Sequence, residues 1–301
     1  MRANAFLSAL PLAIGIGFAV GAPVNAHAQD TETFEMQVDT GRVMVMGGSL
    51  YYEEAGSGPV VVLSHGGFGD RRMWDPQFAA LSSEFRVIRY DHRGFGRTRP
   101  PESGYSPVGD LRALLDALGV ERAHFVGNSV SGSLAIDAAL LIPERLASIT
   151  VIASGPNGMK VDPAAYESVA NVFRTAATAG VDSAVTLWLA SPMIKVASTA
   201  PHTRDAVREM VLDNSGIFLM QQWPEEKLYP PAAQRLGSVT VPALVIIGTE
   251  DMPVVIQAAE FTAAGIPDAT LVRIEGADHL PQLTHPVRVT KALRDFLRSH
   301  Q

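Results

Sequence analysis

A serine at a glycine-rich corner is the residue in this sequence whose setting most clearly predicts chemistry. In the stretch "FVGNSVSGSLAIDAALLIP", an apolar strand-like run passes into a helix-like run, and Ser129 stands at the change. So tight a turn strains the serine backbone and requires small neighbours, which Gly127, Ser131 and Gly132 provide. A phosphate-binding loop is disfavoured, because no Lys-Ser or Lys-Thr pair follows and the G-x-G-x-x-G spacing is absent. The corner therefore predicts a nucleophile at Ser129, with an ordinary glycine-rich turn as the alternative.

A serine hydroxyl is a weak nucleophile and needs a base within hydrogen-bond reach, which an acid must orient. His279 is our choice for the base, because it follows the last strand-like run, in "EGADHLPQL", and precedes the last helix-like stretch. His285 is a rival, but it stands at the start of that helix. The strand-like "VPALVIIG" ends just before two carboxylates, of which we expect Asp251 to be the acid and Glu250 to be the second choice. The predicted catalytic residues are thus Ser129, Asp251 and His279.

Acyl transfer also requires hydrogen-bond donors for the oxyanion, each of which stabilises the transition state by about 3–4 kcal/mol. The backbone N–H of Val130, directly after the serine, is one expected donor. The other is expected from "HGGFG", the loop after the strand-like "VVVLS", where glycines let the backbone approach a substrate closely. Gly67 is the first choice in that loop, and Phe68 is the alternative.

Most of the chain alternates short runs of Val, Ile and Leu with longer stretches whose apolar residues recur at helical spacing. Continuous apolar runs are typical of strands buried on both faces of a parallel sheet, and their alternation with helices predicts an α/β fold. Turn signals and no helix separate the first strands, so that edge of the sheet is expected to be antiparallel. The expected strands are Phe34–Val38, Arg42–Met46, Ser49–Glu54, Val60–Ser64, Phe85–Tyr90, His124–Gly127, Ser148–Ala153, Ala243–Gly248 and Thr270–Ile274. The expected helices are Pro76–Leu81, Val108–Leu118, Ser131–Leu141, Val255–Ala264 and Pro286–Arg298.

The alternation stops between residues 156 and 236, where helix-like pieces with large apolar side chains replace it. We interpret this segment as a helical insertion above the sheet. Its apolar residues either pack against one another in additional helices or form the roof of a substrate pocket. The residues expected to line such a pocket are Phe68, Asn128, Trp188, Met193, Phe218, Met220, Trp223 and Leu280.

The first residues combine a positive charge, an apolar run and a small-residue site, which together predict a secretory signal peptide. Arg2 supplies the charge, Ala5–Val20 the apolar run, and "AHA" the cleavage signature. We expect residues 1–28 to be removed by a cut after Ala28, so that the protein is periplasmic or secreted and is not stably anchored to a membrane. An uncleaved membrane anchor is the alternative, which the shortness of the run and the interruption at Pro11 disfavour.

The composition argues against several classes of function. The net charge of −7 and the pI of about 5.6, without a cluster of Lys and Arg, argue against nucleic acid as a partner. The absence of cysteine excludes disulfides, thiolate catalysis and zinc bound by cysteine. We expect no metal and no organic cofactor, and the expected partner is a small-molecule ester or lactone substrate.

Together these residues resemble the α/β-hydrolase superfamily. The order Ser129, Asp251, His279 is that of the family's triad. Five stretches are similar to conserved motifs of that family and occur in the same order along the chain: "SHGG", "YDHRGFGRT", "GNSVSG", "VIIGTEDMPV" and "GADHLP". One departure is Ser131, which takes the place of the second glycine of G-x-S-x-G and is small enough to fit. The resemblance implies an α/β-hydrolase fold, a mostly parallel sheet flanked by helices, with a core of residues 29–155 and 237–301 and a helical cap of residues 156–236.

Within the superfamily, "GDRRMWDPQFAAL" and "LLDALGVERAHFVGNS" resemble most the 3-oxoadipate enol-lactonase and small-ester hydrolase branch. This resemblance implies a hydrolase that cleaves a carboxylic ester or lactone through an acyl-enzyme. A carbon–carbon bond hydrolase or cofactor-free peroxidase-like enzyme on the same triad is an alternative, although Leu280 stands where such carbon–carbon hydrolases usually carry tryptophan. Two further hypotheses are a proline-type aminopeptidase, which would use Glu225 and Glu226, and a non-catalytic ligand-binding protein of the same fold.

Overall fold

The computed structural model describes residues 36–101, 104–220 and 228–301, which contain an eight-stranded sheet. Its strands run in the order β1-β2-β4-β3-β5-β6-β7-β8. The pairings of β1 with β2 and of β2 with β4 are antiparallel, and all others are parallel. The strands are β1 Asp39–Val45, β2 Gly48–Ala55, β3 Val60–Ser64, β4 Arg86–Tyr90, β5 Ala123–Asn128, β6 Leu146–Ile152, β7 Ala243–Gly248 and β8 Ala269–Ile274.

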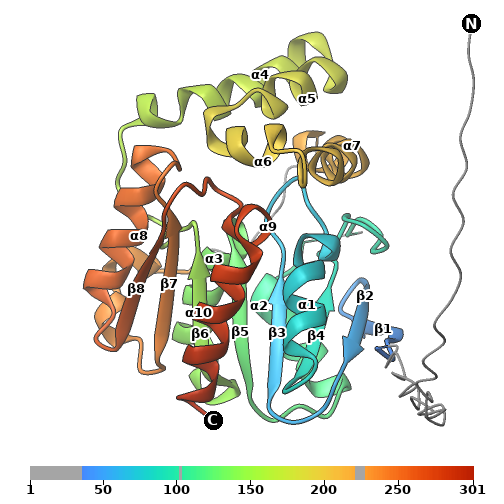
Figure 1. Cartoon of the computed structure of the whole chain (residues 1–301), viewed down its shortest axis with the longest axis vertical. Helices are drawn as coiled ribbons and strands as arrows, with labels where there is room; N and C mark the ends of the chain where they lie inside the picture. Colours follow the sequence, from blue (N-terminus) through green and yellow to red (C-terminus); the bar gives the residue numbers. More distant parts are fainter. Residues whose placement is uncertain (1–35, 102–103, 221–227) are drawn as a thin grey trace, which may run out of the picture. The chain divides into compact units, whose positions relative to one another are not determined.

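Helices cover both faces of this sheet, which explains why every residue of β5 and of β7 is buried. Figure 1 shows α1 and α10 in front of the sheet and α2 and α3 behind it, while α8 packs on β7 and β8. The predicted fold, a mostly parallel α/β sheet flanked by helices, is therefore confirmed. The helices of this core are α1 Asp75–Leu81, α2 Pro107–Ala117, α3 Val130–Leu141, α8 Pro253–Gly265, α9 Pro281–Thr284 and α10 Pro286–Arg298.

The antiparallel edge of the sheet is present, but its first strand lies later in the chain than the sequence pattern predicts. The expected strand Phe34–Val38 is not formed in its described part, residues 36–38. The stretch Asp39-Thr40-Gly41, read as a turn, instead lies within β1. A side chain at Gly41 would come within 2.8 Å of the Tyr52 ring on β2, so the glycine makes room for that ring across the pair and does not mark a turn.

Four helices between β6 and β7 lie together at the end of the sheet where the parallel strands terminate (Figure 1). The described part of this segment contains helices and turns and no strand. A short 3-10 helix, η4 Pro192–Ile194, connects two of the helices. Within the described ranges, no helix of the protein is long and apolar enough to cross a membrane. The four helices are α4 Glu167–Ala179, α5 Val181–Leu189, α6 Lys195–Thr199 and α7 Arg204–Met220.

Candidate active site

Ser129 occupies a strained turn between β5 and α3. Its φ of 56° and ψ of −118° lie outside the regions that L residues prefer. The two elements approach so closely that a Cβ on Gly127 would lie 2.1 Å from the carbonyl oxygen of Ser131. A Cβ on Gly132 would lie 2.5 Å from the Cβ of Ser154. Because β5 ends at the carboxyl edge of the parallel strands, this turn places the serine at the edge where ligands bind in such sheets.

The structure brings the three predicted catalytic residues into one hydrogen-bonded chain. His279 Nε2 lies 2.9 Å from Ser129 Oγ, and His279 Nδ1 lies 2.8 Å from Asp251 Oδ2. The Asp251 side chain is fully buried, and its other oxygen accepts a hydrogen bond of 2.7 Å from the N–H of Met252. A carboxylate at Nδ1 favours the tautomer that carries its proton there and turns the lone pair of Nε2 to the serine.

The two alternative residues, Glu250 and His285, take no part in these hydrogen bonds between Ser129, His279 and Asp251. Glu250 is exposed to solvent, whereas its neighbour Asp251 is buried beside the imidazole. His285 makes its ring hydrogen bond to Thr284 Oγ1, at 3.0 Å. The geometry thus favours the first choice for both the base and the acid.

The surroundings of His279 raise its pKa. Burial disfavours the imidazolium, but the charge and hydrogen bond of Asp251 and the charge of Asp278 together outweigh burial, so the pKa lies above its usual value of 6.5. Because only the neutral imidazole can take a proton from the serine, we expect kcat/KM to fall as the pH is lowered through this raised pKa. A pH profile of ester hydrolysis at low substrate concentration measures this. A midpoint of the acid limb at or below 6.5 would contradict the upward shift of the His279 pKa.

The loop after β3 lies against the turn that carries Ser129, which we call the nucleophile turn. A Cβ on Gly66 would lie 2.7 Å from Asn128 Oδ1, so a side chain there would force Asn128 to move. Gly67 and Val130 both line a cavity with Ser129, and within the described part of the chain their N–H groups have no protein acceptor. Both are therefore available as oxyanion donors. The alternative donor, Phe68, has a φ of 59°, and its ring is stacked on another aromatic ring of the cap.

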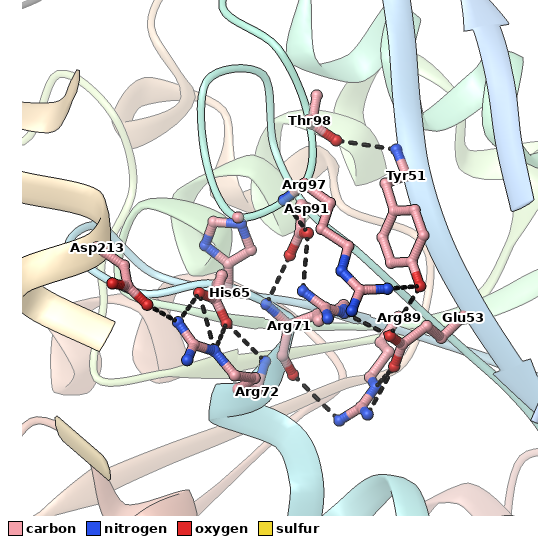
Figure 2. A network of polar contacts seen from close by, with 12 residues as sticks. Tyr51, Glu53, His65, Arg71, Arg72, Arg89, Asp91, Arg97, Thr98 and Asp213 are labelled. Carbon is pink, nitrogen blue, oxygen red and sulfur yellow. Dashed lines mark hydrogen bonds and ion pairs between the residues drawn. The ribbon is translucent and has the colours of Figure 1, made fainter. Parts of the chain in front are cut away.

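Charged side chains fix the far end of this loop (Figure 2). Arg71 binds Asp91 at 3.1 Å and Glu53 at 2.6 Å, both within the core. Arg72 binds Asp70 and also Asp213 of α7, each at 2.7 Å. Burial opposes ionisation of Asp70, but hydrogen bonds from Arg72 and from a cap asparagine lower the pKa of Asp70 to about 2. The loop that carries Gly67 is therefore tied both to the core and to the cap.

Comparison with known proteins identifies the family. The model of the α/β-hydrolase fold family matches residues 59–286 of this chain. The chain belongs to the α/β-hydrolase family. The predicted family and enzyme class, a hydrolase, are thereby confirmed.

Among relatives of this α/β hydrolase is a protein of Azorhizobium caulinodans provisionally named carbamate hydrolase RutD. It is 30% identical over 233 residues, which cover 76% of this chain and 88% of the relative. The 3-oxoadipate enol-lactonase 1 of Acinetobacter baylyi is 27% identical over 249 residues, 81% of this chain and 90% of the lactonase. A solved structure of a thermophilic esterase from Thermogutta terrifontis, described as malate-bound, aligns with a TM-score of 0.72 and 26% identity. It covers 87% of this chain and 100% of the esterase.

A cavity of about 380 Å³ opens on Ser129 and His279 in this α/β hydrolase. Five of the predicted pocket residues line it, from the core and from the cap: Phe68, Asn128, Trp188, Met193 and Leu280. The rings of Phe68 and Trp188 stack with centroids 4.4 Å apart and so join the loop after β3 to α5. The side chains of Phe218 and Met220, and all of Trp223, lie outside the described part of the chain, as do Glu225 and Glu226.

Several lining residues escaped the sequence analysis. They are largely apolar, and most come from the segment after β6, from one face of α4 and from one face of α7. Single residues come from the segment after β3, from η4 and from α8. Their spacing on α7, at i, i+3 and i+4, marks one helical face, but the spacing does not tell whether that face meets a cavity or a core. These additional residues are Met73, Met159, Val161, Tyr166, Val169, Phe173, Ile194, Val207, Met210, Val211 and Val255.

Ser131 has more contacts than its small size led us to expect. Its Oγ donates a hydrogen bond of 2.5 Å to the carbonyl oxygen of His65, at the start of the loop that carries Gly67. The same Oγ accepts from Ser64 Oγ at 2.9 Å and lies 2.9 Å from His92 Nε2. A serine at this position thus ties the turn that carries Ser129 to the loop that carries Gly67, which a glycine could not do.

Proposed function

We propose that this α/β hydrolase is an exported serine hydrolase that cleaves a carboxylic ester or lactone through a Ser-His-Asp triad and an acyl-enzyme. One observation carries the proposal. It is the hydrogen-bonded chain from Ser129 through His279 to the buried Asp251, at the wall of a cavity. Relatives named enol-lactonase and esterase support an ester-type bond as the target.

The reaction follows from the positions of these groups. Ser129 Oγ attacks the carbonyl carbon while its proton passes to His279 Nε2, and Asp251 stabilises the imidazolium. The oxyanion receives hydrogen bonds from the N–H groups of Val130 and Gly67, with Phe68 as the alternative to Gly67. His279 then protonates the leaving alcohol oxygen, the C–O bond breaks, and the acyl group stays on the serine. Water attacks the acyl-enzyme with His279 as base, which releases the acid and restores the serine.

The cavity favours an uncharged acyl group. None of the described residues that line it is Asp, Glu, Lys or Arg, and most of their side chains are apolar. A carboxylate on the substrate would lose its hydration there without gaining a cationic partner, which is costly. The cavity volume of about 380 Å³ is within the range of small-molecule binding sites. We therefore expect neutral esters or lactones of medium size to be better substrates than acyl groups that carry a charge.

Export is the second part of the proposal, and it rests on the sequence of residues 1–28, which lie outside the described residues. The short positive start, the apolar run and the "AHA" site are what a signal peptidase substrate requires. Cleavage after Ala28 would place the enzyme in the periplasm or the medium, where it would meet esters or lactones from outside the cell.

Fluorophosphonate labelling tests both parts in one experiment. The probe is added separately to the whole lysate and to the periplasmic fraction of cells that express the full chain, and the intact mass of the protein is measured in each. We expect a mass that lacks residues 1–28 and carries one phosphonyl group, which the Ser129→Ala variant does not acquire. A labelled protein of full mass would contradict export alone, whereas an unlabelled one would contradict the nucleophile and revive the hypothesis of a ligand-binding protein.

A panel of substrates completes this experiment. It contains p-nitrophenyl acetate, butyrate and hexanoate, a p-nitrophenyl hemisuccinate, γ-butyrolactones and a carbamate ester. We expect the neutral esters or lactones to be hydrolysed, and the hemisuccinate to give a kcat/KM at least about tenfold lower than butyrate, because its carboxylate lacks a partner in the cavity. Labelling without turnover of any of them would move the assignment to carbon–carbon or peptide bonds, as in a carbon–carbon bond hydrolase or an aminopeptidase.

A further inference from the structure

Asp278, the neighbour of the catalytic histidine in the chain, is a buried carboxylate that the proposed mechanism does not use. The residue is wholly buried, so its charge depends on partners within the protein. Its Oδ2 accepts a hydrogen bond of 2.8 Å from the N–H of Ala197, in α6 of the cap. Its Oδ1 accepts a bond of 3.2 Å from the N–H of Leu280, which closes the histidine loop on itself. One side chain therefore joins the loop that carries the base to the cap.

The backbone of His279 is held between the same cap and the nucleophile turn. Its N–H donates to the carbonyl oxygen of Met193, in η4, at 3.1 Å. Its carbonyl oxygen accepts a bond of 3.1 Å from Asn128 Nδ2, the residue before Ser129. Met193 and the next residue, Ile194, also line the substrate cavity. The cap segment that contacts the histidine loop is thus the segment that forms part of the cavity wall.

We propose that Asp278 is a positioning residue that clamps α6 of the cap onto the His279 loop. It thereby supports the backbone bond from His279 to η4 and holds the imidazole and one wall of the substrate cavity together. The proposal rests on the proposed function, because it takes His279 to be the base. Asp278 touches neither the serine nor the carboxylate of Asp251 through any hydrogen bond among the described residues. It acts through backbone contacts and through its charge.

The negative charge of Asp278 has a second effect, on the pKa of His279, which can be tested separately from its hydrogen bonds. Asp278 adds its negative charge to that of Asp251 near the imidazole and helps to raise the pKa of His279. Burial raises the pKa of Asp278 itself, while the two N–H groups and His279 oppose this rise. Further charged and titratable groups here include His285, which senses Asp278 as well as Arg288 and His202, and Tyr166 of the cap, which senses Asp251. Loss of the charge should therefore lower the pKa of His279.

Two substitutions separate the hydrogen bonds from the charge. Asp278→Ala removes both, and we expect kcat to fall by about 10- to 100-fold, because the imidazole loses its fixed position. We also expect KM to rise more for hexanoate than for acetate esters, since a longer chain depends more on contacts with the cavity wall, to which Met193 and Ile194 belong. Asp278→Asn removes the charge but can keep an acceptor for Ala197, so its kcat should stay closer to that of the wild type. In both variants the acid limb of kcat/KM should move to lower pH, because the charge of Asp278 no longer favours the imidazolium.

Thr203→Val is the matched control. Thr203 is buried and donates a hydrogen bond of 2.7 Å to the carbonyl oxygen of Ala197, the residue that Asp278 also contacts. Among the described residues, its hydrogen bonds do not reach the histidine loop. The Thr203→Val substitution should lower the thermal stability without moving the acid limb of kcat/KM or changing how KM depends on acyl chain length. The rate of fluorophosphonate labelling against pH is measured on all variants as well, because it reports the reactivity of Ser129 without any acyl substrate.

The outcomes keep the two proposals apart. If the wild type is neither labelled nor active on any ester, the proposed function fails, and the role of Asp278 fails with it. If the wild type is labelled and active but Asp278→Ala matches it in kcat, KM and pH midpoint, the clamp alone is overturned. A variant that fails to fold is recognised by its circular dichroism, and the Asp278→Asn variant then decides. An unmoved acid limb in a folded, active Asp278→Asn enzyme would contradict the effect of the charge.

Discussion

The Ser129→Ala variant should fold normally and lose about 10⁴- to 10⁶-fold in kcat. Only the Oγ is removed, and the backbone strain at φ 56° is already present in the wild type, so the turn between β5 and α3 should be preserved. Without that oxygen, His279 Nε2 loses the partner that lies 2.9 Å away, and no acyl-enzyme can form. The residual rate would come from the oxyanion donors and from binding alone. Steady-state hydrolysis of p-nitrophenyl butyrate measures the loss.

Ser133→Ala is the appropriate control for this experiment. Ser133 lines the same cavity, but its Oγ donates to the carbonyl oxygen of Gly155 at 2.7 Å and is not bonded to the imidazole. We expect its kcat to stay within about tenfold of the wild type, as for a substitution outside the reacting groups. A Ser129→Ala enzyme that hydrolyses esters at a rate near that of the wild type would show that the triad is not the catalyst.

Asp251→Asn should lower kcat by about 10⁴-fold, the second-largest effect expected. The asparagine fills the same space, but its amide N–H₂ can face His279 Nδ1, where the carboxylate now accepts at 2.8 Å. That arrangement favours the tautomer with its proton on Nε2, which cannot take a proton from Ser129. The amide also cannot stabilise the imidazolium by charge. Burst and steady-state kinetics with the same ester measure both acylation and turnover.

Glu250→Gln controls for the loss of a neighbouring negative charge, since Glu250 is exposed and follows the same strand. Its activity should be close to that of the wild type. An Asp251→Asn enzyme with full activity, together with an inactive Glu250→Gln enzyme, would reverse the assignment of the acid. Full activity in both would direct attention to Asp278, the remaining carboxylate close to the imidazole.

The sequence alone was sufficient to predict the fold and the residues that meet at the carboxyl edge of the sheet. Ser129, Asp251 and His279 each follow the end of a strand-like run within a few residues. In a parallel sheet all such ends lie on one edge, so residues far apart in the chain converge there whatever the details of packing. This convergence is why a separation of 150 positions between Ser129 and His279 did not prevent the prediction of a contact between them.

The start of β1 is an exception within the core, and a contact between two residues explains it. A glycine in a strand and a glycine in a turn look alike in sequence. Only the position of the Tyr52 ring across from Gly41 shows that the residue belongs to β1.

The tertiary structure alone decided what surrounds the three residues. Whether the stripe Val207, Met210 and Val211 of α7 faces a cavity depends on how the cap sits on the core, which helical spacing does not encode. The contact between Asp278 and Ala197 likewise joins positions 81 residues apart through one carboxylate and one backbone N–H. No pattern of residue types marks such a bond, because every residue but proline offers a backbone N–H and only packing selects which one a buried carboxylate will meet.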